Sequence, residues 1–309
     1  MNKLFGYIKE PKRIILYLMN KNLLNWMPDA PYLKLKYYLY MGKKLNLNEP
    51  KSFNEKLQWL KINDRKIIYT KMVDKYEAKK YVANIIGEEY IIPTLGIYNS
   101  FDEINFDKLP NQFVIKCTHD SGGIEIVRDK FKMDKERVRK KINKFMKRNY
   151  FKVHREWPYK NIKPRIIVEK YMKDENDKLM KDYKFFSFGG KPEIMFISER
   201  QENHVTAGMT FFDMNFNLSD CERRDFRRLN YIPKKPITFE KMKNFAGILS
   251  KGIPHVRVDF YEINGELYFG ELTFFTHTGM IPFKDEIWDR KLGDMIDLSL
   301  SRNDEIFCN

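Results

Sequence analysis

The clearest structural signal is the stretch HVRVDFYEINGELYFGELT, residues 255–273. Apolar and polar side chains alternate from Val256 to Tyr261, as they do in a strand with one buried face. A second alternating run follows Asn264-Gly265, a dipeptide typical of tight hairpin turns. The stretch therefore predicts two antiparallel strands that share one apolar face and one polar face.

The polar positions of this hairpin carry candidate chemistry. Arg257 and Asp259 share a face of the first strand, and Glu271 and Thr273 share a face of the second. A two-residue loop would place the two carboxylates on opposite faces, whereas a three-residue loop with Gly265 left-handed brings them together. We predict the three-residue loop. Paired carboxylates suit Mg²⁺ together with substrate phosphates; in the alternative, Arg257 simply neutralises both acids on a solvent-facing sheet.

Further strands and helices flank this hairpin. Residues 1–100 look mainly helical, with a capping box at Ser52 and Glu55 and a helix predicted from Thr70 to Ile86. Strands are predicted at residues 113–117, 124–127 and 165–172, a hairpin at 183–198, and helices at 131–148 and 239–251. Strands grouped into hairpins between helices predict an α+β fold.

Three of these predicted strands carry candidate ligand contacts. Lys116, at the end of a strand, can reach a phosphate as a point charge, and Lys184 is a second candidate. The turn Ser121-Gly122-Gly123 lets backbone N–H groups approach phosphate oxygens, although an ordinary hairpin turn has the same sequence character. The strand through Val168 could offer an adenine ring apolar contacts and backbone hydrogen bonds, or be an ordinary strand. His119, beside the turn, is a candidate phosphate contact or a structural residue.

The charge of the chain is concentrated in two segments. The 309 residues carry a net charge of +15, and their aromatic share of 15% excludes a disordered chain. Residues 1–60 hold eleven Lys and Arg against four acids, and residues 131–160 hold twelve against three. The rest is close to neutral and includes no recognisable nucleic-acid module, so we expect no nucleic-acid partner. Local basic surfaces instead favour an acidic glycan or an anionic membrane.

The sequence also bears on location. Three widely spaced cysteines indicate a reduced, cytoplasmic protein, and no stretch is long and apolar enough for a transmembrane helix. The segment 12–27 mixes the cations Lys12, Arg13 and Lys21 with Ile, Leu, Tyr and Trp. We interpret it either as an interfacial helix on the inner membrane face or as a surface helix packed on the domain.

Long runs of sequence extend these signals into one pattern. They include GKKLNLNEPKSFNEKLQWLK at 42–61, LPNQFVIKC at 109–117, PRIIVEKY at 164–171, RVDFY at 257–261 and FGELTF at 269–274. In these runs the sequence resembles the TupA-like ATP-grasp family, found with polysaccharide and teichuronopeptide synthesis. The resemblance covers nearly the whole chain.

The resemblance implies two α+β lobes that clasp ATP. They are expected at about residues 101–172 and 173–309, within a domain 101–309 that follows a mainly helical region 1–100. It implies a set of residue roles as well: Lys116, Lys184, Ser121, Gly122 and Gly123 at the phosphates; Glu169, Lys170 and Tyr171 at the adenine edge; Asp259, Glu271 and Thr273 on Mg²⁺; and Arg257, with Lys184 and His119, beside the transferred phosphate. Two positions depart from the family pattern: Thr273 replaces a common Asn, and Asp120 adds a negative charge to the glycine turn.

The implied activity is that of an ATP-dependent carboxylate–amine ligase acting through an acyl-phosphate. We expect it to join an amine or amino acid to a uronic acid of an acidic glycan or lipid-linked saccharide. Two alternatives stay open: a glycosyltransferase-like enzyme of the same pathway, which lacks support from an Asp-x-Asp motif, and a nucleotide-binding protein with weakened turnover, suggested by Asp120 and Thr273.

Overall fold

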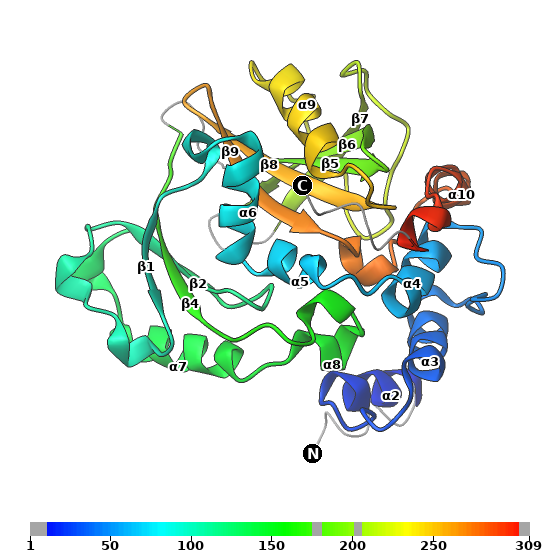
Figure 1. The fold of residues 1–309 in the computed structure, drawn as a ribbon, viewed down its shortest axis with the longest axis horizontal. Helices are drawn as coiled ribbons and strands as arrows, with labels where there is room; N and C mark the ends of the chain where they lie inside the picture. Colours follow the sequence, from blue (N-terminus) through cyan, green and yellow to red (C-terminus); the bar gives the residue numbers. More distant parts are fainter. Residues whose placement is uncertain (1–10, 175–180, 201–205, 303–309) are drawn as a thin grey trace.

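Two antiparallel sheets organise the protein (Figure 1). The computed structural model describes residues 11–174, 181–200 and 206–302. The first sheet has the strand order β1-β4-β2-β3, and the second has the order β7-β6-β5-β8-β9. The strands are β1 (Thr94–Tyr98), β2 (Phe113–Cys117), β3 (Ile124–Val127), β4 (Ile166–Lys170), β5 (Lys181–Phe188), β6 (Lys191–Arg200), β7 (Thr206–Asp213), β8 (Val256–Ile263) and β9 (Glu266–Thr273). The predicted α+β class is confirmed.

The first sheet packs against helix α7 (Lys135–Met146). Val138 and Ile142 of α7 are fully buried in one cluster with Phe113 and Ile115 of β2. The Asp134 side chain accepts a hydrogen bond from the Arg137 N–H and begins the helix. The basic residues of α7 thus form its outer side, as the helical spacing predicts.

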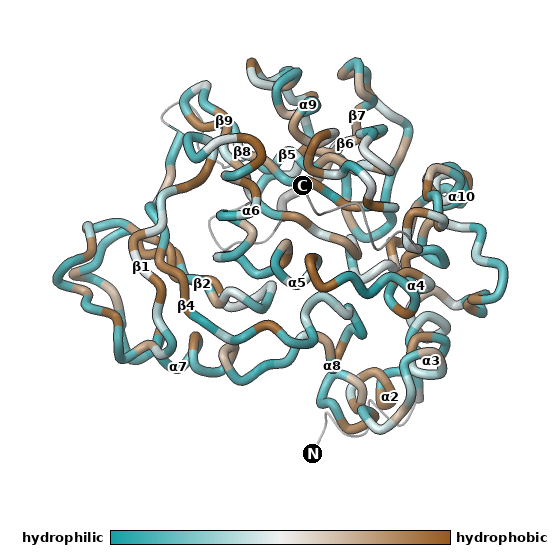
Figure 2. Tube along the Cα trace, viewed as in Figure 1, coloured by the Kyte–Doolittle hydropathy of each residue, from teal (hydrophilic) through white to brown (hydrophobic). Residues whose placement is uncertain are grey.

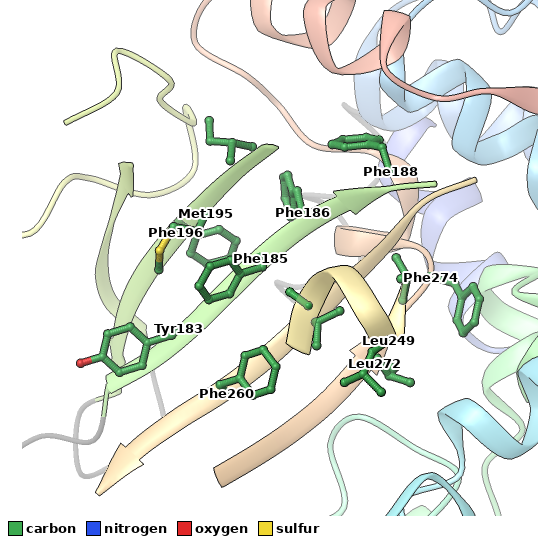
Figure 3. Close-up of a cluster of buried hydrophobic side chains, with 14 of the residues drawn as sticks. Tyr183, Phe185, Phe186, Phe188, Met195, Phe196, Leu249, Phe260, Leu272 and Phe274 are labelled. Atoms are coloured by element: carbon green, nitrogen blue, oxygen red, sulfur yellow. The ribbon is translucent and has the colours of Figure 1, made fainter. Parts of the chain in front are cut away.

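The second sheet is buried on both faces. One face packs against α9 (Phe239–Leu249), where Phe185 lies 6.0 Å from Phe239 between ring centroids. Figure 3 shows part of this cluster, including Phe260 of β8 and Leu249 of α9. The other face holds a cross-strand row that runs from β9 to β7: Glu271, Asp259, Lys184, Phe196 and Phe211. Residues paired across antiparallel strands share a face, so this row places charged and aromatic side chains side by side.

Helices from the N-terminal part of the chain pack against the second sheet. The N-terminal helices are α2 (Pro11–Asn20), α3 (Asp29–Met41), α4 (Phe53–Asn63), α5 (Ile68–Val73) and α6 (Glu77–Ile86). Two further α-helices in the described part of the chain are α8 (Tyr150–His154) and α10 (Glu286–Asp294). The capping box of Ser52 and Glu55 begins α4, as predicted. Phe53 stacks on Phe186 at 5.8 Å, so α4 covers part of the face that carries the charged row. Helices α5 and α6 lie between the two sheets in Figure 1.

The single helix predicted from Thr70 to Ile86 is wrong. Helix α5 ends at Val73 and α6 begins at Glu77. The Asp74 side chain accepts hydrogen bonds from the N–H groups of Tyr76 and Glu77, at 2.8 and 3.0 Å. A carboxylate that caps the second helix in this way competes with continuation of the first.

Strand β1 ends the predicted helical region and joins the first sheet. It pairs antiparallel with β4, from Thr94 opposite Glu169 to Tyr98 opposite Ile166. Figure 2 shows hydrophobic residues along β4 and hydrophilic residues along much of α7. Within residues 11–174, 181–200 and 206–302, no helix is long and apolar enough to cross a membrane.

The predicted meeting of Asp259 with Glu271 is observed, but the predicted turn is wrong. Ile263 pairs with Glu266, so the loop has only two residues, Asn264 and Gly265, both with positive φ. The register then shifts between the pairs Phe260–Phe269 and Asp259–Glu271, leaving Gly270 as an extra residue in β9. This β-bulge, and not a longer loop, brings the two carboxylates to the same face.

Candidate functional site

Arg257 lies at the centre of the polar face of the β8–β9 hairpin. Its guanidinium donates two hydrogen bonds of 2.6 Å to the two carboxylate oxygens of Asp259. The same Nη2 atom donates to Glu271 Oε1 at 2.9 Å and to Thr273 Oγ1 at 3.0 Å. Three side-chain oxygens from three residues therefore converge on one cationic nitrogen.

Burial and pairing set the charge of this cluster. Burial alone would lower the pKa of Arg257, but the carboxylates of Asp259 and Glu271 raise it, so the guanidinium stays charged. Lys184 adds a second cation, with its Nζ 2.5 Å from Asp259 Oδ2 and 3.4 Å from Asp182 Oδ1. Asp259 is fully buried between these two cations, while the Glu271 side chain is 45% exposed.

The same oxygens suit a divalent cation. Carboxylate and hydroxyl oxygens are the hard ligands that Mg²⁺ takes, usually with substrate phosphates and water completing the shell. In the described residues no group of three or more His, Cys, Asp or Glu side chains gathers as a metal set. The cluster offers two carboxylates and a hydroxyl, from Asp259, Glu271 and Thr273. The position of Arg257 Nη2 marks where these three residues can hold a positive charge, and the donor set fits Mg²⁺.

Lys116 belongs to β2 of the first sheet, and it is paired. Its Nζ lies 2.5 Å from Glu169 Oε2, and Lys79 of α6 pairs with the other Glu169 oxygen. Burial alone would raise the pKa of Glu169, but Lys116 and Lys79 lower it to about 2. Glu169, predicted at the adenine edge, is therefore an ionised carboxylate held between two lysines.

The other two predicted adenine contacts follow Glu169 on β4. Lys170 is exposed, and its N–H donates to the Pro93 carbonyl at 2.9 Å. Tyr171 follows directly after the strand and is half-buried. The backbone N–H of Lys170 is thus already bonded to the segment that enters β1.

The backbone of the glycine turn between β2 and β3 is hydrogen-bonded to the carboxylate of Asp120, which belongs to the same turn. Asp120 Oδ1 accepts from the N–H groups of Ser121 and Gly122, at 2.6 and 3.3 Å, and Asp120 Oδ2 lies 3.3 Å from Arg148 Nη1. The Gly123 carbonyl accepts from the Cys117 N–H at 2.7 Å. The amides that a phosphate would use are therefore directed at a carboxylate of the protein itself.

The glycines of this turn also fit it against α7. A Cβ on Gly122 would lie 2.7 Å from Phe145, and one on Gly123 would lie 2.6 Å from the Cys117 sulfur. His119 is buried beneath the turn, where burial lowers its pKa below the ordinary value, against the opposing effect of Asp120. His119 is therefore a neutral side chain at this position.

Lys75 is a site residue to which the sequence analysis assigned no role. Its Nζ donates to the Asp120 carbonyl at 2.6 Å. Burial lowers its pKa, and the charges of Glu271 and Lys116 both act on it. Lys75 therefore lies where the two sheets approach each other. Lys75 lies between α5 and α6, just after the break at Asp74. Helical periodicity alone does not predict this break, so it does not single out Lys75.

Comparisons with known proteins cover the same elements. A family model described as TupA-like ATPgrasp matches residues 55–297, which include both sheets and every candidate residue from Lys75 to Thr273. Among curated proteins, none matches significantly.

Several solved structures resemble the chain. D-alanine–D-alanine ligase from Bacillus anthracis is 18% identical with a TM-score of 0.41, and the match covers 81% of this chain and 70% of that one. The same enzyme from Helicobacter pylori is 16% identical with a TM-score of 0.40, covering 73% and 61%. N5-carboxyaminoimidazole ribonucleotide synthetase from Thermus thermophilus is 10% identical with a TM-score of 0.38, covering 66% and 45%.

Proposed function

We propose, because the chain belongs to the TupA-like ATP-grasp family, that it is an ATP-dependent carboxylate–amine ligase whose ATP site lies between the two sheets. The observation that carries the proposal is the convergence of Asp259, Glu271 and Thr273 oxygens on Arg257. Lys184 lies in the same cluster, and the buried Lys75 lies within reach of the charges of both Glu271 and Lys116. Such a site can hold the phosphates of ATP among cations and carboxylates.

The proposed reaction has two steps. A carboxylate oxygen of the substrate attacks the γ-phosphorus of ATP, and the bond from this phosphorus to the β-phosphate oxygen breaks. ADP is the leaving group, and the substrate becomes an acyl-phosphate. An amine then attacks the acyl carbon, the bond to the phosphate oxygen breaks, and the amine loses a proton, giving an amide and inorganic phosphate. Arg257 and Lys184 stabilise the charge on the transferred phosphoryl group.

Mg²⁺ would be held by Asp259, Glu271 and Thr273, and it would neutralise charge on the ATP phosphates. For that, Arg257 exchanges its carboxylate partners for a phosphate oxygen. The exchange leaves a charged guanidinium next to an anion in both states, so the buried charge stays paired.

The acceptor we propose is a uronic acid of a cell-surface polysaccharide or a lipid-linked saccharide, with an amino acid or another amine as the nucleophile. The net charge of +15 supports an acidic substrate. Residues 1–60 and 131–160 carry this excess of positive charge, and the second range includes α7.

An anionic membrane face is the peripheral partner we propose for the N-terminal segment. Tyr17, Leu23 and Trp26 are exposed, Trp26 at 78%, and the cations Lys12 and Lys21 belong to the same segment. Aromatic and aliphatic side chains beside lysines suit the headgroup region of a bilayer. Sedimentation with vesicles of phosphatidylglycerol against phosphatidylcholine tests this: we expect binding to the anionic vesicles, lost in Trp26→Ala/Leu23→Ala. Equal binding to both vesicles contradicts it.

A nucleotide-binding protein with weakened turnover is the second candidate. Asp120 favours it, because its carboxylate accepts from the Ser121 and Gly122 amides that would contact phosphate. In that case ATP binds weakly and is not cleaved.

Two measurements on the purified protein separate these candidates. Thermal unfolding with ATP and Mg²⁺, compared with UDP-sugars, is expected to show stabilisation by ATP alone. ADP release is then measured with uronic acid oligomers and amino acids, together and separately. The ligase proposal expects ADP only when carboxylate and amine are both present. Stabilisation by ATP without ADP release supports the second candidate, and stabilisation by UDP-sugars alone contradicts both.

A further inference from the structure

A second concave surface lies at the outer strand of the five-stranded sheet. The depression has a volume of about 440 Å³. Met209 and Phe211 of β7 form its apolar floor, and the chain from Cys221 to Arg228 together with Lys284 forms its walls.

The walls are built by backbone hydrogen bonds. The Ser219 N–H donates to the Phe211 carbonyl at 2.9 Å, and the Met209 N–H donates to the Arg227 carbonyl at 3.0 Å. The Lys284 N–H donates to the Glu222 carbonyl at 2.8 Å. The segment 219–228 is thus fastened to β7 and to the chain that follows β9, so the depression belongs to the fold and does not depend on a loose loop.

The lining is strongly cationic. Five basic residues contribute to it, against the single acid Glu222: Arg223, Arg224, Arg227, Arg228 and Lys284. Glu222 is shared by Arg228 at 2.7 Å and Lys284 at 2.6 Å, and Arg223 forms a two-point pair with Asp225.

Two basic residues of the lining are not used in the ion pairs just described. Arg224 and Arg227 are exposed, and neither makes an ion pair with any residue of the described ranges 11–174, 181–200 and 206–302. Their guanidinium groups can therefore take a carboxylate or phosphate in the two-point geometry that arginine favours.

This depression lies on the same sheet face as the proposed catalytic cluster. Phe211 pairs with Phe196, Phe196 with Lys184, and Lys184 with Asp259. Two strand spacings separate β7 from β5, which is about 10 Å. The wall also contacts the loop after β9, because Asp225 lies 3.5 Å from His277, four residues beyond Thr273.

We infer that this depression is an acceptor subsite, in which Arg224 and Arg227 bind an anionic group of a saccharide while the half-buried Phe226 packs against its ring. The inference rests on the proposed ligase function and adds where the acidic acceptor is held. An anionic sugar anchored here places the next units of the same chain toward Lys184 and Arg257. Binding energy from this remote group then supports the reaction at the phosphate.

The test is binding of defined saccharides to the full chain without ATP, measured by ligand-observed NMR. Trigalacturonate supplies carboxylates, glucose 1-phosphate supplies a phosphate, and maltotriose is neutral. The test variant is Arg224→Gln/Arg227→Gln. The control is Lys191→Gln/Lys251→Gln, which removes the same charge from two exposed lysines outside the depression and outside α7.

We expect an anionic probe, and not maltotriose, to bind the wild type. The dissociation constant should rise about tenfold or more in the test variant and less than about twofold in the control. Which anionic probe binds identifies carboxylate or phosphate as the recognised group. Equal weakening in both variants, unchanged binding in the test variant, or no anionic probe bound by the wild type overturns the subsite.

Stabilisation by ATP and Mg²⁺, measured in parallel, separates this result from the proposed function. ATP should stabilise the wild type and both variants equally. If ATP fails to stabilise the wild type but the pocket variant still loses saccharide binding, the ligase proposal fails and the anion site stands.

Discussion

Asp259 and Glu271 face each other across β8 and β9 because Gly270 adds one residue to β9. Without this bulge the two-residue Asn264-Gly265 turn would direct the two carboxylates to opposite faces of the sheet. The proposed catalytic cluster therefore depends on a single glycine that supplies no ligand atom itself. This dependence can be tested by changing the glycine alone.

Gly270→Ala should impair ATP turnover more than its cost in stability explains. A Cβ at this position would lie 3.0 Å from the Asp259 carbonyl oxygen and 3.2 Å from Tyr261. We expect a loss of about 2 kcal/mol in the free energy of unfolding, together with a fall in kcat. Gly265→Ala is the control, because nothing lies within 4 Å of its Cβ, although its φ of +79° costs about 1 kcal/mol. Equal effects of the two substitutions on kcat would contradict a special role for the bulge.

Glu169→Gln should destabilise the protein strongly. The substitution leaves Lys79 and Lys116 close together without the carboxylate that pairs with both. We expect about 3 kcal/mol lower unfolding free energy in urea titrations. Glu125→Gln is the matched control, since Glu125 also bridges two cations, Arg137 and Lys141, but at the surface. There the loss should be below about 1 kcal/mol. Similar losses of unfolding free energy in the two variants would mean that the ion pairs of Glu169 stabilise the fold no more than surface pairs do.

The sequence predicts the helices and strands of this fold better than their ends and their register. Alternation reveals β8 and β9, and helical spacing reveals α7, because each signal is local. The break at Asp74 and the bulge at Gly270 depend on capping and on register, which a pattern of apolar residues does not record. Pairing between distant residues is also hidden: Lys116 and Glu169 are each visible as candidates, but their ion pair, and the second pair of Glu169 with Lys79, are not.

Asp120→Asn should strengthen ATP binding. The substitution keeps an oxygen that can accept from the Ser121 and Gly122 amides but removes a negative charge from the proposed phosphate turn. We expect the dissociation constant for ATP with Mg²⁺ to fall about tenfold by calorimetry. Asp129→Asn, in a turn where Asp129 accepts from the Phe131 amide, should leave it unchanged. Weaker ATP binding in Asp120→Asn would contradict this prediction and mean that the negative charge of Asp120 holds the turn in its binding conformation.

His255 should make the protein sensitive to acid. Burial lowers its pKa from 6.5 to about 3, and its Nδ1 bonds to the Ser187 carbonyl at 3.1 Å. In the unfolded chain it takes up a proton near pH 6.5, whereas the folded protein keeps it neutral. Its contribution is therefore complete above pH 6.5 and is lost toward pH 3, at roughly 1.4 kcal/mol per pH unit.

His255→Phe removes this pH-dependent contribution to the free energy of unfolding while keeping an aromatic ring beside Phe53. Urea unfolding at pH 7.0, 6.0 and 5.0 should show a steeper loss of stability in the wild type than in the variant. Parallel loss in the two proteins would show that His255 does not titrate on unfolding.

The central claim is that Asp259 and Glu271 serve ATP turnover, and ADP release by single substitutions at these positions tests it most directly. Asp259→Asn and Glu271→Gln are compared with Glu266→Gln, which changes an exposed acid on the same strand as Glu271. With saturating ATP, Mg²⁺, acceptor and amine, we predict a loss of about 100-fold or more in kcat for the first two and wild-type kcat for the third. Full turnover by Asp259→Asn and Glu271→Gln, in protein that is folded by circular dichroism, would contradict the assignment.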